Sequence, residues 1–408
     1  MRGALSLPFL RLYMLVFLYF SANAILNVFI PLYGHSEGVS NTGIGLIMGA
    51  YLFTTMFFRP FAGYMIEKYG AIRVLKLILL LNALALLLYT FTSPVGFAGA
   101  RMLQGVCTAF FSMALQIGIM DALPEKERSQ GISLYSLFSY VPGMIGPLLA
   151  LAIWQSGMTY FTIVMISLAL LTTLTGFQTR LGPEEGNVSP EPSEAQSQSK
   201  PSAPARLSFR QLMNHPMLLR CSLLMLVASL VFGSISTFIP LYALELAAGN
   251  AGVFLMLQAG VVVLSRFTLR KRIPSDGKWH RGFILLVMVM LASAAMCVSL
   301  SAAGGVLFFY AGALLTGLVQ ALLYPTLTTY LSFALPPEKR NVLLGLFIAS
   351  ADLGISMSGV VMGPIADYFS YTFMYMICAL LCIPLLFLGY GSGQGRSAAA
   401  AERMDVQG

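Results

Sequence analysis

Asp352 and Arg101 lie well inside long apolar runs of this 408-residue chain, where a charge is costly to bury. Asp352 is the carboxylate that falls near the middle of such a run. It could carry a proton, or it could make a structural hydrogen bond to a neighbouring helix. Arg101 lies about two turns inside another run. Its guanidinium could bind a carboxylate through two parallel hydrogen bonds, or it could hold backbone carbonyls.

Polar side chains accompany these two residues at helical spacing. One stripe over 94–121 recurs every three or four residues, which is the period of one helix face. It consists of Arg101, Gln104, Thr108, Ser112 and Gln116, and a second stripe over 304–334 consists of Thr316, Gln320, Tyr324 and Thr328. Hydrogen bonds between helices, worth about 0.6 kcal/mol each, are one reading of any single polar residue. Two matching stripes favour a shared aqueous cavity.

The chain therefore offers a set of predicted ligand contacts. They are Asn23, Asn27, Arg101, Gln104, Gln116, Gln258, Gln320 and Tyr324. No acidic residue of 9–32, 42–65, 94–121 or 131–154 faces the predicted cavity. A pump for cationic drugs would use such a carboxylate, so the charge pattern favours an anionic or zwitterionic substrate.

The elements that must position these residues are membrane-spanning helices. Apolar residues make up 57% of the chain and charged residues 10%, against about 25% charged in a soluble domain. Twelve stretches are long enough to cross a bilayer, at roughly 20 residues each. They are 9–32, 42–65, 73–92, 94–121, 131–154, 158–177, 216–244, 249–268, 281–302, 304–334, 342–366 and 370–391. The fold class is an all-α membrane protein with twelve transmembrane helices.

An internal repeat divides these helices into two sets. Phe29-Ile-Pro-Leu-Tyr33 returns as Phe238-Ile-Pro-Leu-Tyr242, and Ala122-Leu-Pro-Glu-Lys126 matches Ala334-Leu-Pro-Pro-Glu-Lys339. Two similar halves predict two pseudo-symmetric six-helix bundles with a binding site between them, as in transporters. We expect the bundles over 1–177 and 216–391, a flexible linker over 178–215 and a disordered tail over 392–408.

The net charge of +8 is a topological signal. Alternate loops carry the basic residues, and the loops near 33–42, 91–97, 155–158, 244–250 and 367–371 contain no Lys or Arg. By the positive-inside rule, both termini and the linker are expected in the cytoplasm of a cell whose plasma membrane holds the chain. The charge thus indicates a lipid bilayer as partner and no nucleic acid.

The sequence gives no indication of a metal site, a cofactor site or an enzyme active site. The five cysteines all lie in apolar runs, and the three histidines are scattered without metal-ligand spacing. No nucleotide-binding loop and no catalytic triad stand out. We expect no metal, no cofactor and no enzymatic activity.

Three motifs resemble those of the major facilitator superfamily. The loop after 42–65 is similar to its cytoplasmic signature, with Glu67 in place of the usual Asp. The predicted gating residues in it are Gly63, Glu67, Lys68, Gly70 and Arg73. Arg101-Met-Leu-Gln-Gly105 resembles the Arg-x-x-Gln-Gly motif of proton-coupled members, which implies a coupling role for Arg101. Pro142-Gly-Met-Ile-Gly-Pro147 resembles the antiporter motif, with Pro142 in place of a glycine.

Longer strings resemble the staphylopine-type metallophore exporters of Gram-positive bacteria. Among them are Gly3-Ala-Leu-Ser-Leu-Pro-Phe-Leu-Arg-Leu-Tyr13 and Gln104-Gly-Val-Cys-Thr-Ala-Phe-Phe111. The resemblance implies proton-driven efflux of an opine chelator that carries several carboxylates. In that reading Asp352 and Arg101 are the coupling groups, and we expect a monomer. The alternatives are a broad drug or sugar efflux antiporter, and an importer or transport-dead sensor.

Overall fold

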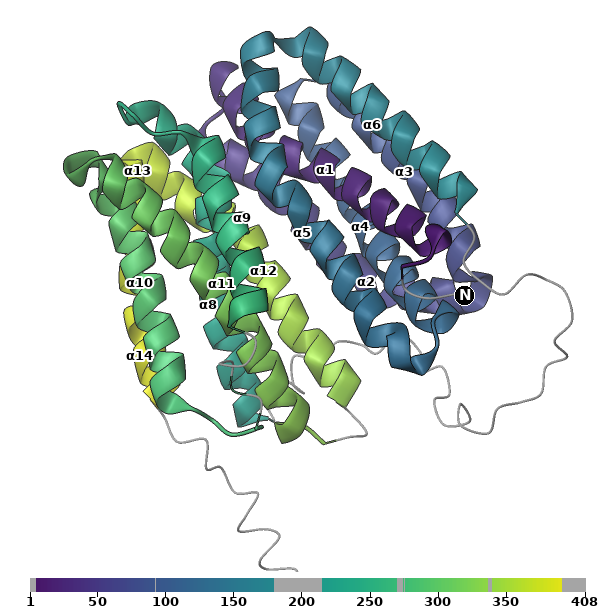
Figure 1. Ribbon diagram of the computed structural model, residues 1–408. Coiled ribbons are helices and arrows are strands. Elements are labelled where there is room, and N and C mark those ends of the chain that lie inside the picture. The colour runs from purple at the N-terminus through teal and green to yellow at the C-terminus, as the bar shows by residue number, and fades with distance from the viewer. Residues whose placement is uncertain are drawn as a thin grey trace, which may run out of the picture. The chain divides into compact units, whose positions relative to one another are not determined.

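All regular secondary structure in the described residues is helical (Figure 1). The computed structural model describes residues 5–91, 93–179, 215–269, 274, 276–336 and 340–390. Within them, twelve helical stretches are long and apolar enough to cross a membrane, which confirms the predicted spans. The predicted linker over 178–215 and tail over 392–408 lie outside the described residues, apart from 178, 179 and 215.

The chain divides into two compact units. Unit 1 is Met1–Val39 with Leu46–Arg206, and unit 2 is Ser40–Gly45 with Leu207–Gly408. Unit 1 contains α1 (Leu7–Ser36), most of α2 (Asn41–Tyr69), α3 (Ala71–Phe91), α4 (Pro94–Ala122), α5 (Glu125–Ser156) and α6 (Met158–Gln178). Unit 2 contains α8 (Pro216–Glu245), α9 (Ala251–Thr268), α10 (Arg281–Gly304), α11 (Val306–Ala334), α12 (Arg340–Tyr368), α13 (Tyr371–Leu381) and α14 (Ile383–Tyr390).

Two helix ends differ from the prediction for local reasons. The predicted helix over 370–391 is two helices, α13 and α14, which meet at Cys382. Pro384 has no backbone N–H to donate, and the amide of Cys382 bonds the carbonyl of Ala379 instead of continuing the regular ladder. Helix α5 begins at Glu125, six residues before the predicted start, because hydropathy detects the apolar core and not the polar first turn.

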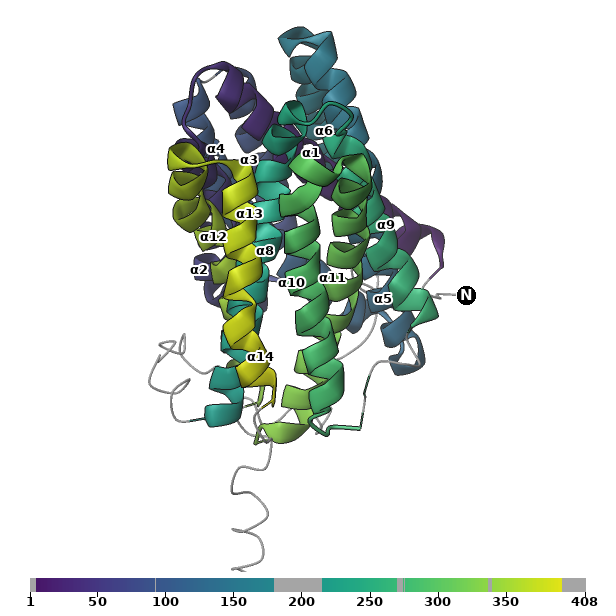
Figure 2. The same ribbon diagram turned by 90° about the vertical axis from the view of Figure 1, so that its left-hand side faces the viewer.

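Helix pairing is the same in both units. In unit 1, α1 packs against α5 and α3 packs against α4 and α6. In unit 2, α8 packs against α12 and α10 packs against α11 and α13. Figure 2 shows α13, α10 and α11 side by side. The pairing agrees with the repeat seen in the sequence, since each pair in unit 1 has its counterpart in unit 2.

Gly105 and Gly317, which correspond in the repeat, each allow a close helix crossing. A Cβ atom on Gly105 of α4 would collide with the backbone carbonyl oxygen of Tyr51 on α2. A Cβ on Gly317 of α11 would collide with the carbonyl oxygen of Gln258 on α9. The missing side chain lets the two backbones approach, as small residues do between membrane helices. Each close approach sets how the two helices are aligned along their axes, and with them the polar residues nearby.

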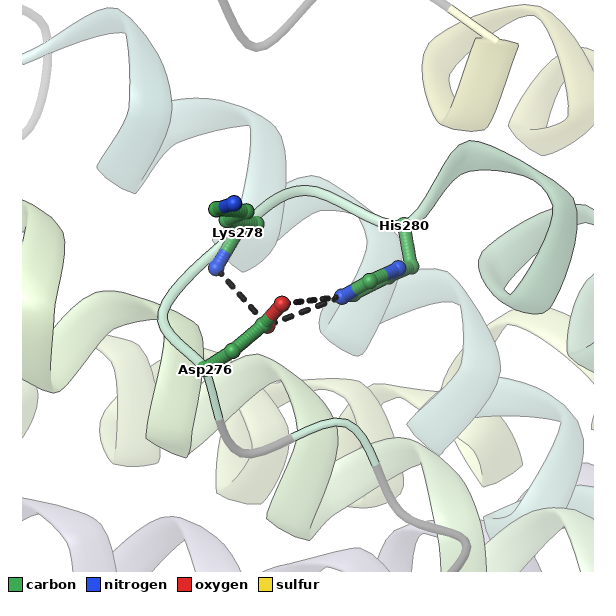
Figure 3. A network of polar contacts seen from close by, with 3 residues as sticks. All are labelled: Asp276, Lys278 and His280. Atoms are coloured by element: carbon green, nitrogen blue, oxygen red, sulfur yellow. Dashed lines mark hydrogen bonds and ion pairs between the residues drawn. The ribbon is translucent and has the colours of Figure 1, made fainter.

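The loop before α10 is held by a carboxylate (Figure 3). Oδ1 of Asp276 accepts a hydrogen bond of 3.1 Å from the backbone N–H of Lys278. The same oxygen lies 2.8 Å from Nε2 of His280. The hydrogen bond from His280 is the main cause that lowers the pKa of Asp276 below its ordinary value, and the amide of Lys278 adds to it. The carboxylate therefore orders the chain just before α10 begins.

Candidate substrate-binding and coupling sites

Arg101 lies in α4 with its side chain fully buried. Its Nη1 donates a hydrogen bond to Oδ1 of Asn23, and its Nη2 donates to Oδ1 of Asn27, both at 2.7 Å. The two asparagines are one turn apart on α1, so their carbonyl oxygens meet the two ends of one planar guanidinium. The structure thus brings together three of the predicted ligand residues.

Four other helical residues surround the guanidinium, and one of them is Met48 of α2, whose Sδ lies 3.4 Å from Nη2. Nη1 of Arg101 also lies 3.4 Å from Oε1 of Gln104, which accepts a hydrogen bond from Tyr89 at 3.0 Å. The ring of Tyr51 lies 5.2 Å from the guanidinium carbon, in cation–π contact. We call Asn23, Asn27, Tyr51, Tyr89, Arg101 and Gln104 the Arg101 cluster. All six belong to unit 1.

The Arg101 cluster holds a cation among neutral groups. Every contact of the guanidinium within the described part of the chain is an amide oxygen, a thioether sulfur or an aromatic ring. Burying a lone charge costs several kcal/mol, which a carboxylate partner repays better than neutral dipoles do. Nε of Arg101 and Nε2 of Gln104 are buried without a hydrogen-bond acceptor among these residues. The site can therefore take an anion.

A hydroxyl network continues from the cluster along α4. Oγ1 of Thr108 donates to the carbonyl of Gln104, and it lies 2.9 Å from the hydroxyl of Tyr19 and 3.0 Å from that of Tyr51. The sequence prediction missed Tyr19, Tyr51 and Tyr89. A signal existed for the first, because Tyr19 precedes Asn23 by one turn on the same face of α1.

Gln116 lies apart from the Arg101 cluster. It follows Arg101 by fifteen residues, or about 22 Å along the helix axis. A contact between Gln116 and a ligand stays a prediction.

In unit 2 the predicted residues form a smaller polar group. Nε2 of Gln258 on α9 donates to Oε1 of Gln320 on α11 at 3.2 Å. Tyr324 follows Gln320 by one turn, and its ring centroid lies 6.0 Å from that of Phe347. These three residues can offer amide and hydroxyl groups to a polar ligand, and their role in binding stays a prediction.

Asp352 lies in α12 and is 8% exposed. Its own backbone carbonyl accepts a hydrogen bond from the hydroxyl of Ser356 at 2.8 Å. A carboxyl group at this depth in an apolar helix is costly to keep charged, so a proton carrier is a fitting role. Asp352 and Arg101 belong to different units.

The predicted gating residues lie in the last turns of α2, at Gly70 between the helices and at the start of α3. Glu67, Lys68 and Arg73 are exposed, and Gly63 lies on the helix itself. Gly70 has a φ of +83°, which reverses the chain between α2 and α3 and strains any residue with a side chain. Nζ of Lys68 lies 5.1 Å from the ring centroid of its neighbour Tyr69. A gating role for this loop stays a prediction.

The described residues contain no group of three His, Cys, Asp or Glu side chains that could hold a metal ion. The five cysteines are unpaired thiols. Nothing in these residues provides a preformed site for a metal bound to the protein alone.

The repeat shows that the Arg101 cluster has no counterpart in unit 2. The offset that aligns Ala122 with Ala334 pairs Arg101 with Ala313. The offset of the repeated pentapeptide pairs Asn23 with Phe232 and Asn27 with Ser236. The helix scaffold is therefore duplicated, but the buried cation and its ligands are present once.

Comparisons with known proteins agree with this picture. A sequence model of the Major Facilitator Superfamily matches residues 12–292. The chain is 50% identical to the staphylopine export protein of Staphylococcus aureus (strain Mu50) over 391 residues, which cover 96% of this chain and 97% of that relative. It is 28% identical to an uncharacterized MFS-type transporter of Burkholderia mallei (strain SAVP1) over 149 residues, 36% of either chain.

Solved structures share the fold. A mutant of the nucleoside transporter NupG has a TM-score of 0.77 at 14% identity, over 93% of this chain and 98% of that one. A bacterial homologue of the human lysosomal transporter Spinster, inward-facing and unoccupied, has a TM-score of 0.70 at 14% identity, over 93% of each chain. At such identity the likeness establishes the fold alone. The two resemblances read from the sequence are confirmed.

Proposed function

Because this chain belongs to the major facilitator superfamily, we propose that it exports a staphylopine-like opine metallophore in exchange for protons. The chain is a multi-pass membrane transporter and not an enzyme. The substrate, the coupling ion and the mechanism are the proposal. The observation that carries it is the buried guanidinium of Arg101, whose partners among the described residues are neutral, in a relative of a staphylopine exporter.

Substrate binding follows from the geometry of the Arg101 cluster. An opine-type chelator carries several carboxylates, and one of them can replace the amide oxygens of Asn23 and Asn27 on the guanidinium. A carboxylate makes charge-assisted hydrogen bonds about twice as strong as neutral ones. The asparagine amides can then turn their NH₂ groups to the ligand, since each side chain has both donors and an acceptor. The cation is thus held ready before the substrate arrives.

Proton coupling is assigned to Asp352 together with Arg101. Protonation removes the cost of a carboxylate inside the membrane, so the state of Asp352 can bias which side of the membrane its surroundings face. Proton entry on one side then drives chelator exit on the other by alternating access. The chain works as a monomer in this scheme.

The direction of transport requires a topology. The helix ends around the α2–α3 turn and the chain at the start of α10 carry Lys68, Arg73, Lys278 and Arg281, whereas the alternate loops carry no Lys or Arg. We assign the basic loops, and with them both termini, to the cytoplasm of a bacterial cell. The gating loop at Gly70 then faces the cytoplasm.

Transport in inside-out vesicles tests the proposal. Vesicles with an imposed proton gradient receive an opine-type metallophore in one arm and a cationic dye in the other. We expect gradient-dependent uptake of the metallophore alone. Uptake of the dye alone would indicate a multidrug antiporter and overturn the substrate assignment.

Two variants separate binding from coupling. Arg101→Ala is expected to abolish metallophore uptake. Arg281 is an exposed arginine in unit 2, and Arg281→Ala is expected to transport like the wild type. Asp352→Asn is expected to retain exchange of metallophore across the membrane without a gradient and to lose the response to a proton gradient. The exposed carboxylate Asp276 provides the control Asp276→Asn. A normal gradient response in Asp352→Asn would remove Asp352 from coupling.

A further inference from the structure

We propose that unit 1 binds the phosphate headgroup of an anionic phospholipid where α1 begins and α6 ends. A cavity of about 430 Å³ lies there, lined by Pro8, Arg11, Phe177, Gln178 and Thr179. It is separate from the substrate site, because Arg11 precedes Asn23 by twelve residues, or about 18 Å along α1. The transport proposal makes no use of it.

Two basic side chains lie at this cavity or next to one of its lining residues. Arg11 lines it with an exposed side chain. Lys76 of α3 places its Nζ 5.7 Å from the ring centroid of the lining residue Phe177. No acidic residue occurs anywhere in α1, α3 or α6, so no carboxylate of these helices competes for the two charges. A guanidinium that lines the cavity and an ammonium that contacts one of its lining residues are groups that bind phosphate.

Neutral groups at the cavity also suit an anion. The first turn of α1 contains no acidic residue, and the side chain of Ser6 makes no capping hydrogen bond there. The C-terminal end of α6 is the negative end of its helix dipole. There the amide and the hydroxyl of Thr179 both donate hydrogen bonds to the carbonyl of Gly176, so this carbonyl is satisfied within the helix. Gln178 is exposed at the rim and can donate its amide.

The surface beside the cavity favours a lipid over a free phosphate ion. Leu10 and Met14, one turn apart on α1, are 41% and 48% exposed, and Leu174 and Phe177 on α6 are 58% and 46% exposed. These apolar side chains extend from the cavity along the two helices that flank it. Acyl chains can lie on them while the phosphate occupies the cavity, whereas a soluble ion would use the cavity alone.

Thermal unfolding of the full chain in zwitterionic nanodiscs tests the site, with phosphatidylglycerol titrated into the bilayer. We expect the lipid to raise the unfolding temperature of the wild type. Arg11→Gln and Lys76→Gln should each weaken the dependence on phosphatidylglycerol about fivefold. Arg281→Gln, the loss of one exposed cation in unit 2, should leave it unchanged.

Two outcomes of these unfolding measurements would overturn the proposal. One is an equal response of the wild type and the Arg11→Gln/Lys76→Gln double variant to phosphatidylglycerol. The other is equal stabilisation by inorganic phosphate in detergent, which would indicate a soluble anion site. Hydrogen exchange of the wild type needs no variant: phosphatidylglycerol, and not phosphatidylcholine, should slow exchange at the start of α1 and the end of α6. Uniform protection of all helices would also contradict the site.

Discussion

Nη2 of Arg101 donates a 2.7 Å hydrogen bond to Oδ1 of Asn27, across the interface between α4 and α1. Asn27 is neutral, so this contact orients the guanidinium without cancelling its charge. The same holds for Asn23 on the other terminal nitrogen. In the proposed transport scheme, the pair keeps this buried cation available for the carboxylate of the substrate.

Asn27→Asp is expected to close the site. The new carboxylate would form an ion pair with Arg101 and occupy the group that the substrate needs, so substrate binding should weaken about 10- to 100-fold. The unfolding temperature should rise, because the buried cation gains a partner. Vesicle uptake and thermal unfolding measure the two effects.

Asn27→Ser is the matched control for that substitution. It keeps a neutral acceptor and introduces the residue found at the corresponding position of unit 2, Ser236. Uptake should fall about 3- to 10-fold, less than in Asn27→Asp, because a neutral hydrogen bond is lost and no charge is added. Wild-type uptake in Asn27→Asp would show that the substrate does not use the guanidinium.

The ring and the hydroxyl of Tyr51 each contribute to stability, and two substitutions measure the contributions separately. Tyr51→Phe keeps the ring over Arg101 and removes the bond to Thr108, which should cost about 1 kcal/mol of folding free energy. Tyr51→Leu also removes the cation–π contact and should cost roughly 2 kcal/mol more in this desolvated setting. Denaturation in detergent measures the difference. Equal costs would mean that the ring does not stabilise the cation.

Gly105→Ala is expected to destabilise unit 1. Its methyl group would meet the backbone of Tyr51, and such overpacking costs about 1–3 kcal/mol. Gly99→Ala is the control on the same helix, because a Cβ there meets no atom within 4 Å. It should be neutral or stabilising by up to about 1 kcal/mol. The unfolding temperatures of the two variants are compared. Equal values would contradict the close approach of α4 and α2 at Gly105.

The Asp276 carboxylate gives a prediction for pH. Its folded-state pKa is lowered, so its contribution to stability is present above the ordinary pKa of aspartate and is lost as the pH falls through the folded value. His280→Gln should raise the Asp276 pKa toward the ordinary value, and His215→Gln should leave it unchanged. A carboxyl carbon NMR titration measures both. An unshifted titration in His280→Gln would mean that another group lowers the pKa.

Hydropathy and spacing predicted much of this molecule. Twelve spans follow from the thickness of a bilayer, and the stripe from Arg101 to Thr108 follows from the helical period. Asn23, Asn27 and Gln104 were predicted as contacts on these grounds and lie around Arg101. Their proximity to Arg101 has a physical reason, because polar groups are costly to bury in apolar helices and therefore meet one another. Their contact with a ligand stays a prediction.

The partners across helices could not be read from the chain. Tyr51 and Tyr89 blend into apolar runs, since a tyrosine ring is mostly hydrophobic and only its hydroxyl needs a partner. Which face of α2 or α3 meets α4 depends on helix rotation, which the close approach at Gly105 sets. Gln116 shares the stripe of Arg101 but lies too far along the helix to join the cluster.

The unequal halves have an evolutionary consequence. Arg101 corresponds to Ala313, and the offset that aligns Gly146 with Gly363 pairs Asp352 with Tyr135. After duplication, each half thus carries an ionisable group that the other lacks. The two halves are no longer interchangeable: a tandem of two first halves would have two buried guanidiniums and no Asp352. Divergence has left two copies of one helix scaffold with different ionisable residues, and the proposed transport cycle needs both.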